Sequence, residues 1–175
     1  YDRIPETRLS DALPPQRSSP SRENEERLRD LLVDHGLQEI ITYRMTTPER
    51  EARRLAPGTP PDDKPYVRLR NPIASDRVVM RHSLLASVLE IVERNARLQE
   101  RLAFFEIGPI FIAAESGLPD ELPRLVIALT GPRALPGWQG ADLNPMDFYD
   151  LKGMVEGMLG GLHVGEAPGA RRGRF

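Results

Sequence analysis

Hydrophobic residues recur at helical spacing in three stretches of this chain. The first stretch, about 20–35, follows Ser19-Pro20, since serine accepts from the free N–H groups of a first turn and proline suits that turn. Gly36 then closes this helix. Ser83 is a plausible cap for a second helix over about 84–98, and Asp147 or Asp150 can cap a third, which Gly160-Gly161 stops. The apolar positions of these helices are, in order, Leu28, Leu31 and Leu32; Leu84, Leu85, Val88, Leu89 and Val92; and Leu151, Met154, Val155, Met158 and Leu159.

Shorter segments carry the patterns of strands. β-branched and aromatic residues favour a strand over 38–45, and the alternation in 66–70 favours a half-buried one. Two more strands, 102–107 and 110–113, are predicted on either side of Gly108-Pro109. The segment 124–130 is mostly apolar, which predicts a central strand covered on both faces. The remaining pieces are a short helix over 49–55 opened by Thr47-Pro48, a proline-rich loop over 56–65, and a long loop over 131–145 that carries Trp138.

Strands interspersed with helices and joined by tight breaks predict an α+β fold, with an antiparallel β-sheet flanked by helices. The length of 175 residues fits one domain. Residues 1–18 contain three prolines and no apolar periodicity, so we expect an extended lead-in from a preceding domain, followed by one module over 19–175. We expect this module to be truncated at its C-terminus, because Gly165 to Phe175 is either a tail or the beginning of a strand.

Composition excludes several classes of protein. Charged residues make up 29% of the chain, and no apolar run approaches the ~20 residues of a spanning helix, which excludes a membrane protein. The net charge of −2 argues against a dominant electrostatic grip on nucleic acid. Zero cysteines leave no disulfide framework and no thiolate metal site, which is compatible with a cytoplasmic protein.

Catalytic patterns are also missing. The histidines, His35, His82 and His163, are too scattered to predict a triad or a zinc site. Asp142, Asp147 and Asp150 match no calcium-loop spacing.

Several separated blocks, in order, resemble one family. The most specific block is Arg70-Asn71-Pro72 with Ser75-Asp76 and Met80-Arg81-His82-Ser83-Leu84-Leu85. The others are Tyr1 to Thr7, Gly36 to Tyr43, Phe105-Glu106-Ile107-Gly108 with Phe111, and Asp147 to Gly153. Together they resemble the bacterial phenylalanyl-tRNA synthetase beta chain, in its catalytic-like core module. The resemblance implies a class II aminoacyl-tRNA synthetase-like fold that does not perform the class II chemistry.

The resemblance also shows what is lacking. In the class II pattern an arginine follows the strand that begins at the Phe105–Gly108 block, with a glutamate two residues later. Here Phe111 is followed by Ile112, Ala113 and Ala114. Such residues cannot stabilise charge at an α-phosphate, and no glycine-rich motif ending in arginine follows. We therefore predict no catalytic, cofactor-binding or metal residues and no cofactor in this chain, with ATP and magnesium implied for the holoenzyme.

The resemblance implies partners as well. These are an alpha chain, in an alpha2beta2 heterotetramer, and tRNA through the holoenzyme, with a cytoplasmic location and no membrane. The module is expected to serve as a structural and subunit-association part of an enzyme that attaches phenylalanine to tRNA(Phe) using ATP. Candidate interface residues are Leu28, Leu31, Leu32, Ile41, Tyr43, Arg70, Asn71, Pro72 and Arg81. This hypothesis predicts an apolar patch left uncovered in the chain alone.

Other interpretations stay open. The chain could be a free-standing, degenerate class II adenylate-forming ligase, or an RNA-binding module that uses Arg171, Arg172 and Arg174. Several motif residues also have purely structural interpretations. Arg81 can pair with an acid or cover apolar surface, Gly108 can supply unusual backbone torsions, and Lys152 can pair with Glu106 or Asp150.

Overall fold

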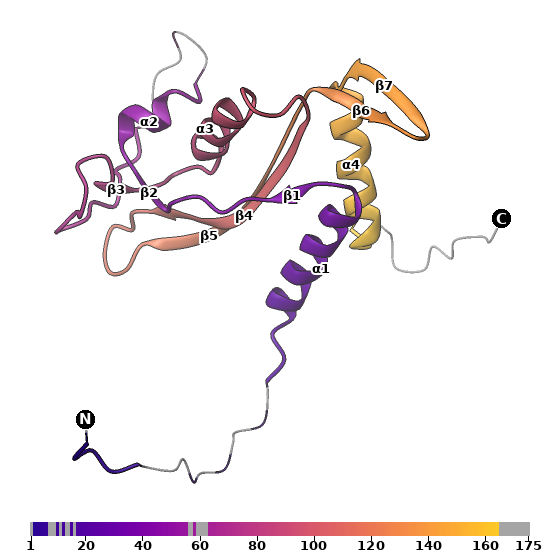
Figure 1. Ribbon diagram of the computed structural model, residues 1–175. Coiled ribbons are helices and arrows are strands. Elements are labelled where there is room, and N and C mark those ends of the chain that lie inside the picture. Colours follow the sequence, from indigo (N-terminus) through magenta and orange to yellow (C-terminus); the bar gives the residue numbers. More distant parts are fainter. Residues whose placement is uncertain are drawn as a thin grey trace.

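The computed structural model describes residues 2–6, 10, 12, 15, 17–55, 58 and 63–164. The C-terminal arginines 171, 172 and 174 and most of the predicted 56–65 loop lie outside these residues. The elements are α1 Pro20–Asp34, β1 Gln38–Glu39, β2 Met45–Thr46, α2 Pro48–Ala52, β3 Val79–Met80, α3 Leu85–Asn95, β4 Leu102–Ile112, β5 Asp120–Thr130, β6 Pro132–Gly137, β7 Gly140–Pro145 and α4 Phe148–Gly161. The predicted α+β class is confirmed (Figure 1).

The long strand β4 is the centre of the main sheet. It pairs in parallel with β1 and antiparallel with β5, over the full register from Leu102 opposite Thr130 to Ile112 opposite Asp120. The prediction of a covered central strand at 124–130 is wrong, because β5 is the last strand of this sheet among the described residues and its side chains are half-buried or exposed. An apolar run predicts that a strand is buried on average. It does not predict whether other strands pair with both of its edges.

Helices pack on both sides of β4. Alternate residues of a strand face opposite sides, so Ala103 and Phe105 join Leu32 of α1 and Met158 of α4 in one apolar cluster. On the other side, Glu106 and Gly108 face the segment that leads into α3, which also contacts β4 and β5. Figure 1 shows α3 against the β4–β5 ribbon, with α1 and α4 side by side.

Two glycines let α1 and α4 approach closely. A Cβ atom at Gly157 would lie 2.7 Å from the ring of His35, and one at Gly161 would lie 2.6 Å from Cδ2 of Leu31. The guanidinium of Arg27 also donates to the Gly161 carbonyl at 2.8 Å. The helix α4 ends at Gly161, as the Gly160-Gly161 pair predicts, and both glycines still belong to its last turn. Gly161 is therefore a packing position at the end of the helix.

Strand β4 runs without a break through Gly108-Pro109, against the prediction of two strands. Pro109 has no N–H to donate. The residue opposite it on β5, Pro123, is also a proline, so neither member of this pair has an N–H that could be left unpaired. The Pro109 carbonyl accepts from Nε of Arg81 at 2.9 Å, and Phe111 donates its N–H to the Arg81 carbonyl at 2.9 Å. Arg81, which directly follows β3, thus supplies hydrogen bonds that hold this part of the strand.

The predicted 131–145 loop is instead the β6–β7 hairpin. Gly131 opens it with a positive φ of 92°, and a Cβ there would lie 1.9 Å from the Glu100 carbonyl oxygen. Gly140, also at positive φ, begins the second strand. Glycines and prolines were interpreted as loop residues, but here they form the ends and turn of a hairpin.

Three shorter predictions also change. The 38–45 strand is split into β1 and β2, and 66–70 forms a single bridge, Arg68 to Val79. The helix predicted at 49–55 is α2, with the Thr47 hydroxyl accepting from the Arg50 N–H at 3.3 Å.

The helix predicted from Ser83 is α3, but its N-cap residue is Leu84 rather than the predicted Ser83. The Ser83 hydroxyl still accepts from the Leu85 N–H at 3.1 Å. Leu85 and Leu89 are exposed rather than buried, because Ala86 and Val88 face the core. At α4 both predicted caps are present, since Asp147 and Asp150 form a capping box.

Candidate functional site

A buried ion pair fixes the segment between β1 and β2. Arg81 Nη1 donates to Glu106 Oε1 at 2.8 Å, with both side chains almost fully buried. Thr42 completes the network, since its hydroxyl donates to Glu106 Oε2 at 2.7 Å and accepts from Arg81 Nη1 at 2.9 Å. Its N–H also donates to Glu106 Oε1 at 3.3 Å. The Arg81–Glu106–Thr42 network therefore joins β4, the residue after β3 and the half-buried Thr42.

Gly108 is part of this arrangement for a steric reason. A Cβ atom at Gly108 would lie 2.6 Å from Nη2 of Arg81, so only glycine lets the guanidinium cross β4. Unusual torsions were the predicted reason, but its φ is not in the positive region. The acid expected for Arg81 is Glu106, whereas Lys152 pairs with Glu156 at 3.4 Å rather than with Glu106 or Asp150.

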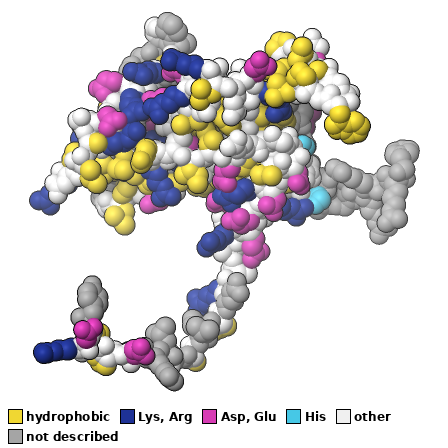
Figure 2. Space-filling model, in the orientation of Figure 1, with side chains coloured by type: hydrophobic (Ala, Val, Ile, Leu, Met, Phe, Trp, Pro, Cys, Tyr) yellow, Lys and Arg dark blue, Asp and Glu magenta, His cyan; other side chains and the backbone are white. Residues whose placement is uncertain are grey.

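The inward position of Thr42 leaves its two neighbours outside. Ile41 is 89% exposed and Tyr43 is 68% exposed, and the guanidinium of Arg77 lies 4.8 Å from the centre of the Tyr43 ring. We call Ile41, Tyr43 and the covering Arg77 the apolar ledge. Figure 2 shows hydrophobic side chains gathered on the side of the body that carries β2 and β3, with arginines and lysines beside them. A rigid support beneath exposed apolar side chains is typical of a docking surface.

A hollow of about 140 Å³ lies beside the ledge, between residues 41–46 and α3. Arg50 bridges it: Nε donates to Glu90 Oε1 at 2.9 Å, and Nη1 donates to Asp76 Oδ2 at 2.9 Å. The hydrogen bonds from Arg50 hold the pKa of Glu90 below its usual range, and those bonds with Glu90 raise the pKa of Arg50. The rest of the wall is apolar or carries hydroxyl and guanidinium groups, namely Ile41, Thr42, Tyr43, Met45, Thr46, Arg77, Ser87, Ile91 and Arg94.

A second buried carboxylate holds the β3–α3 junction. Glu51 of α2 accepts the N–H of His82 at 2.9 Å on one oxygen and Nη1 of Arg54 at 2.8 Å on the other. The Tyr66 hydroxyl donates to the same carboxylate at 3.1 Å, and burial together with Glu51 raises the pKa of Tyr66. The His82 ring is buried and stacks on Tyr66 at 3.9 Å, without a hydrogen-bond partner for either ring nitrogen among the described residues.

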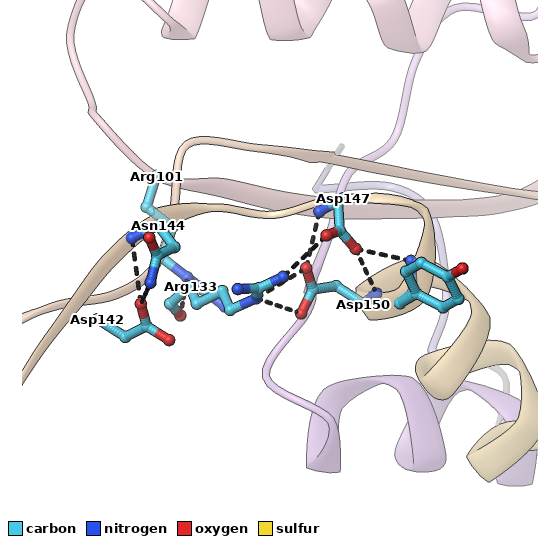
Figure 3. A network of polar contacts seen from close by, with 7 residues as sticks. Arg101, Arg133, Asp142, Asn144, Asp147 and Asp150 are labelled. Carbon is cyan, nitrogen blue, oxygen red and sulfur yellow. Dashed lines mark hydrogen bonds and ion pairs between the residues drawn. The ribbon is translucent and has the colours of Figure 1, made fainter.

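The β6–β7 hairpin is tied to the start of α4 (Figure 3). Arg133 donates Nε to Asp150 at 2.9 Å and Nη2 to Asp147 at 3.0 Å, so the two capping carboxylates also hold the hairpin. Hydrogen bonding to Arg133 lowers the pKa of Asp150 and raises that of Arg133. Asp142 accepts from Asn144 within β7, as Figure 3 shows. These aspartates serve structure in this arrangement.

The structure separates the predicted interface residues into three groups. Leu32 and Arg81 are buried within the chain, so neither is available at its surface for contact with a partner. Leu28 and Leu31 of α1 are half-buried. Leu28 packs against the apolar cluster on the sheet, and Leu31 lies against Gly161 of α4. Ile41, Tyr43, Arg70, Asn71 and Pro72 are exposed. Sequence reasoning missed the buried Glu51 and the Arg50–Glu90 pair, because acidic residues on short helices usually face solvent.

In the β4–β5 hairpin Ile112 lies opposite Asp120, and Ala113 and Ala114 follow it. These are the residues after Phe111, where the family resemblance leads us to expect the class II arginine. Within the described residues no group of three or more histidine, aspartate or glutamate side chains is placed to hold a metal ion. None of the described helices is both long and apolar enough to span a membrane.

Comparison with known proteins agrees with these features. The model of the phenylalanyl tRNA synthetase beta chain CLM domain, the catalytic-like module, matches residues 4–172. The phenylalanine–tRNA ligase beta subunit of Syntrophus aciditrophicus is 36% identical over 166 residues, covering 94% of this chain and 20% of that protein. The beta subunit of Syntrophotalea carbinolica is 39% identical over 170 residues, with the same coverage. The chain thus spans about a fifth of the length of these relatives.

Solved structures show the fold. A pyrrolysyl-tRNA synthetase from Desulfitobacterium hafniense superposes with a TM-score of 0.61 at 18% identity, covering 84% of this chain and 48% of that one. A histidine–tRNA ligase subunit from Alicyclobacillus acidocaldarius gives a TM-score of 0.57 at 16% identity, covering 90% and 44%. With a class II synthetase-like fold and a family match over nearly its whole length, the chain belongs to the family of catalytic-like modules of the phenylalanyl-tRNA synthetase beta chain.

Proposed function

We propose that this chain is the non-catalytic subunit-association module of a phenylalanyl-tRNA synthetase beta chain. With an alpha chain it forms an alpha2beta2 assembly in the cytoplasm that attaches phenylalanine to tRNA(Phe) using ATP. The observation that carries the proposal is the apolar ledge, where Ile41 and Tyr43 are exposed on a segment fixed by a buried network. Moving such a side chain out of water is favourable by roughly 1.5–3 kcal/mol. This free energy is gained when a partner covers the ledge and is not gained while the ledge stays in water.

Neighbouring residues extend this surface. Arg70, Asn71 and Pro72 are exposed in the loop that ends at Arg77, and the fully exposed Ile73 lies in the same loop. Arg77 links that loop to Tyr43. We therefore assign to the interface the ledge together with residues 70–73.

The non-catalytic part of the proposal rests on the β4–β5 hairpin. Attack on the α-phosphate of ATP needs a positive group placed where negative charge develops in the transition state. Ile112 and the alanines after it offer only apolar side chains at the class position. The chemistry, ATP and magnesium are accordingly assigned to the alpha chain.

The test uses full-length beta chain and its cognate alpha chain. We expect Ile41→Asp with Tyr43→Asp to weaken association, measured by analytical ultracentrifugation, because the substituted carboxylates would be desolvated in the interface. Trp138→Asp is the matched control. Trp138 is 93% exposed on the β6–β7 hairpin, which Figure 1 shows at the other end of the body from β2 and β3.

Two results would contradict the proposal. Unchanged association of the double variant would remove the ledge from the interface. ATP–pyrophosphate exchange by the beta chain alone, without alpha chain, would show that the module or its chain is catalytic.

A further inference from the structure

The hollow beside the ledge carries more positive than negative charge. Three guanidinium groups, Arg50, Arg77 and Arg94, line it. Arg50 is paired with both nearby carboxylates, Glu90 and Asp76, and Arg77 shares Asp76 at 3.5 Å. Asp76 does not line the hollow but pairs with two of these arginines, so three positive charges are balanced by two negative ones, which leaves a surplus of one.

Arg94 carries that surplus. It is exposed in the last turn of α3. Its charge helps to lower the pKa of Glu90, but that carboxylate accepts its hydrogen bonds from Arg50, and no hydrogen bond or ion pair joins Arg94 to a described residue. Water solvates Arg94 while the ledge is exposed. A partner that covers Ile41 and Tyr43 also covers the hollow, because both residues line it. The guanidinium of Arg94 would then lose water and need an acceptor, since an unpaired charge inside an interface is costly.

We propose that one aspartate or glutamate side chain of the alpha chain enters this hollow and pairs with Arg94. The inference rests on the proposed function, because it assumes that the alpha chain covers the ledge. It adds the chemistry of the contact, which is a single carboxylate flanked by apolar groups that pack on Ile41, Tyr43 and Ile91.

The size and walls of the hollow fit such a group. A volume of about 140 Å³ is close to that of cavities that hold a benzene-sized molecule, so one side chain fills it. An apolar side chain would leave Arg94 desolvated and unpaired, and a basic one would add to the surplus charge. Ser87 supplies a hydroxyl group in the same wall, which can donate to the second carboxylate oxygen.

The first experiment measures the dissociation of full-length beta chain from alpha chain by exchange with labelled alpha chain. Arg94→Glu is expected to raise the dissociation constant by about tenfold or more, because two carboxylates then meet in one desolvated site. Arg97→Glu is the matched control, since Arg97 is exposed just beyond α3 and does not line the hollow. Equal effects of the two substitutions would show only general charge attraction and would overturn the proposal.

The second experiment identifies the partner residue. Arg94→Lys keeps the charge and introduces an amine, which a carbodiimide couples directly to a carboxylate in contact with it. A cross-linked peptide that joins position 94 to an alpha-chain aspartate or glutamate is expected. Cross-links from position 94 to beta-chain carboxylates alone would overturn the inference.

Different results would contradict the carboxylate contact and the proposed function. If Ile41→Asp with Tyr43→Asp weakens association while Arg94→Glu does not, the ledge is an interface and the carboxylate contact is wrong. If neither weakens association, the proposed function itself fails.

Discussion

Buried charge is the most consequential feature of this chain at the scale of single residues. Arg81 and Glu106 are both almost fully buried, and each is satisfied by the other together with Thr42 and the Pro109 carbonyl. We predict that Arg81→Met lowers the free energy of unfolding by about 3–5 kcal/mol, because it leaves an uncompensated carboxylate in the interior. Urea unfolding of the chain measures this.

The double variant Arg81→Met with Glu106→Gln distinguishes the free-energy cost of an unpaired buried charge from the cost of lost packing. It removes both charges and keeps a side-chain oxygen for Thr42, so we expect it to be more stable than Arg81→Met alone. A double variant less stable than the single one would mean that lost packing, not the unpaired charge, is the main cost.

The Arg50–Glu90 pair predicts a pH dependence. Arg50 depresses the pKa of Glu90 in the folded chain, so the unfolded chain binds more protons near that pKa. The stabilisation is present in full above the ordinary glutamate pKa of about 4.3 and is lost as pH falls through the folded value. We expect Glu90→Gln to flatten the acid side of a plot of unfolding free energy against pH, while Glu93→Gln, exposed on the same helix, leaves the slope unchanged.

At the scale of elements, the contact between α1 and α4 depends on glycine. A Cβ at Gly161 would collide with Leu31, whereas Gly153 of the same helix has no atom within 4 Å of its Cβ position. We predict that Gly153→Ala raises the free energy of unfolding by about 0.5–1 kcal/mol through helix propensity. Gly161→Ala is expected to lower it by about 1–2 kcal/mol through overpacking. Thermal unfolding of both variants tests the pair, and equal stabilisation by both would show that the helices separate easily.

The same elements show what a sequence pattern can predict. Spacing predicted α1, α3 and α4, because helical periodicity is a local property. Of the predicted N-terminal caps, Asp147 and Asp150 of α4 form a capping box, whereas the Ser19 side chain makes no capping bond at α1 and Leu84 rather than Ser83 is the N-cap residue of α3. Spacing failed at β4, where Arg81, distant in sequence, bonds the strand across Gly108-Pro109. It failed again at the β6–β7 hairpin, whose first glycine is required by contact with the Glu100 backbone.

The candidate site, too, could be predicted only in part from the sequence. Ile41 and Tyr43 could be chosen from the family resemblance, but their exposure could not, since it follows from Thr42 turning inward to Glu106. The hollow depends on Arg50, Asp76 and Glu90, which come from three separate segments. No local pattern joins such residues, so only the fold reveals the charge surplus at Arg94.

At the scale of the whole molecule, the ledge makes a prediction about the chain in isolation. Without a partner, Ile41 and Tyr43 remain in water on a rigid segment, and the fully exposed Ile73 lies in the adjoining loop. Exposed apolar groups of this kind favour association. We expect the sedimentation coefficient of the 175-residue chain to rise with its concentration. Because carboxylates resist desolvation, Ile41→Asp with Tyr43→Asp should abolish the rise.

A control distinguishes association through the ledge from association through other exposed apolar residues of the chain. Ile4 is also exposed, but it lies ahead of α1 rather than in the segment between β1 and β2, so Ile4→Asp should leave the concentration dependence unchanged. If Ile4→Asp suppresses association as strongly as the ledge variant, the lead-in rather than the ledge holds the copies together. If all three proteins sediment as monomers at every concentration, the ledge is too small to drive association by itself. Its affinity for an alpha chain would then have to come mainly from complementary contacts such as the carboxylate proposed for Arg94.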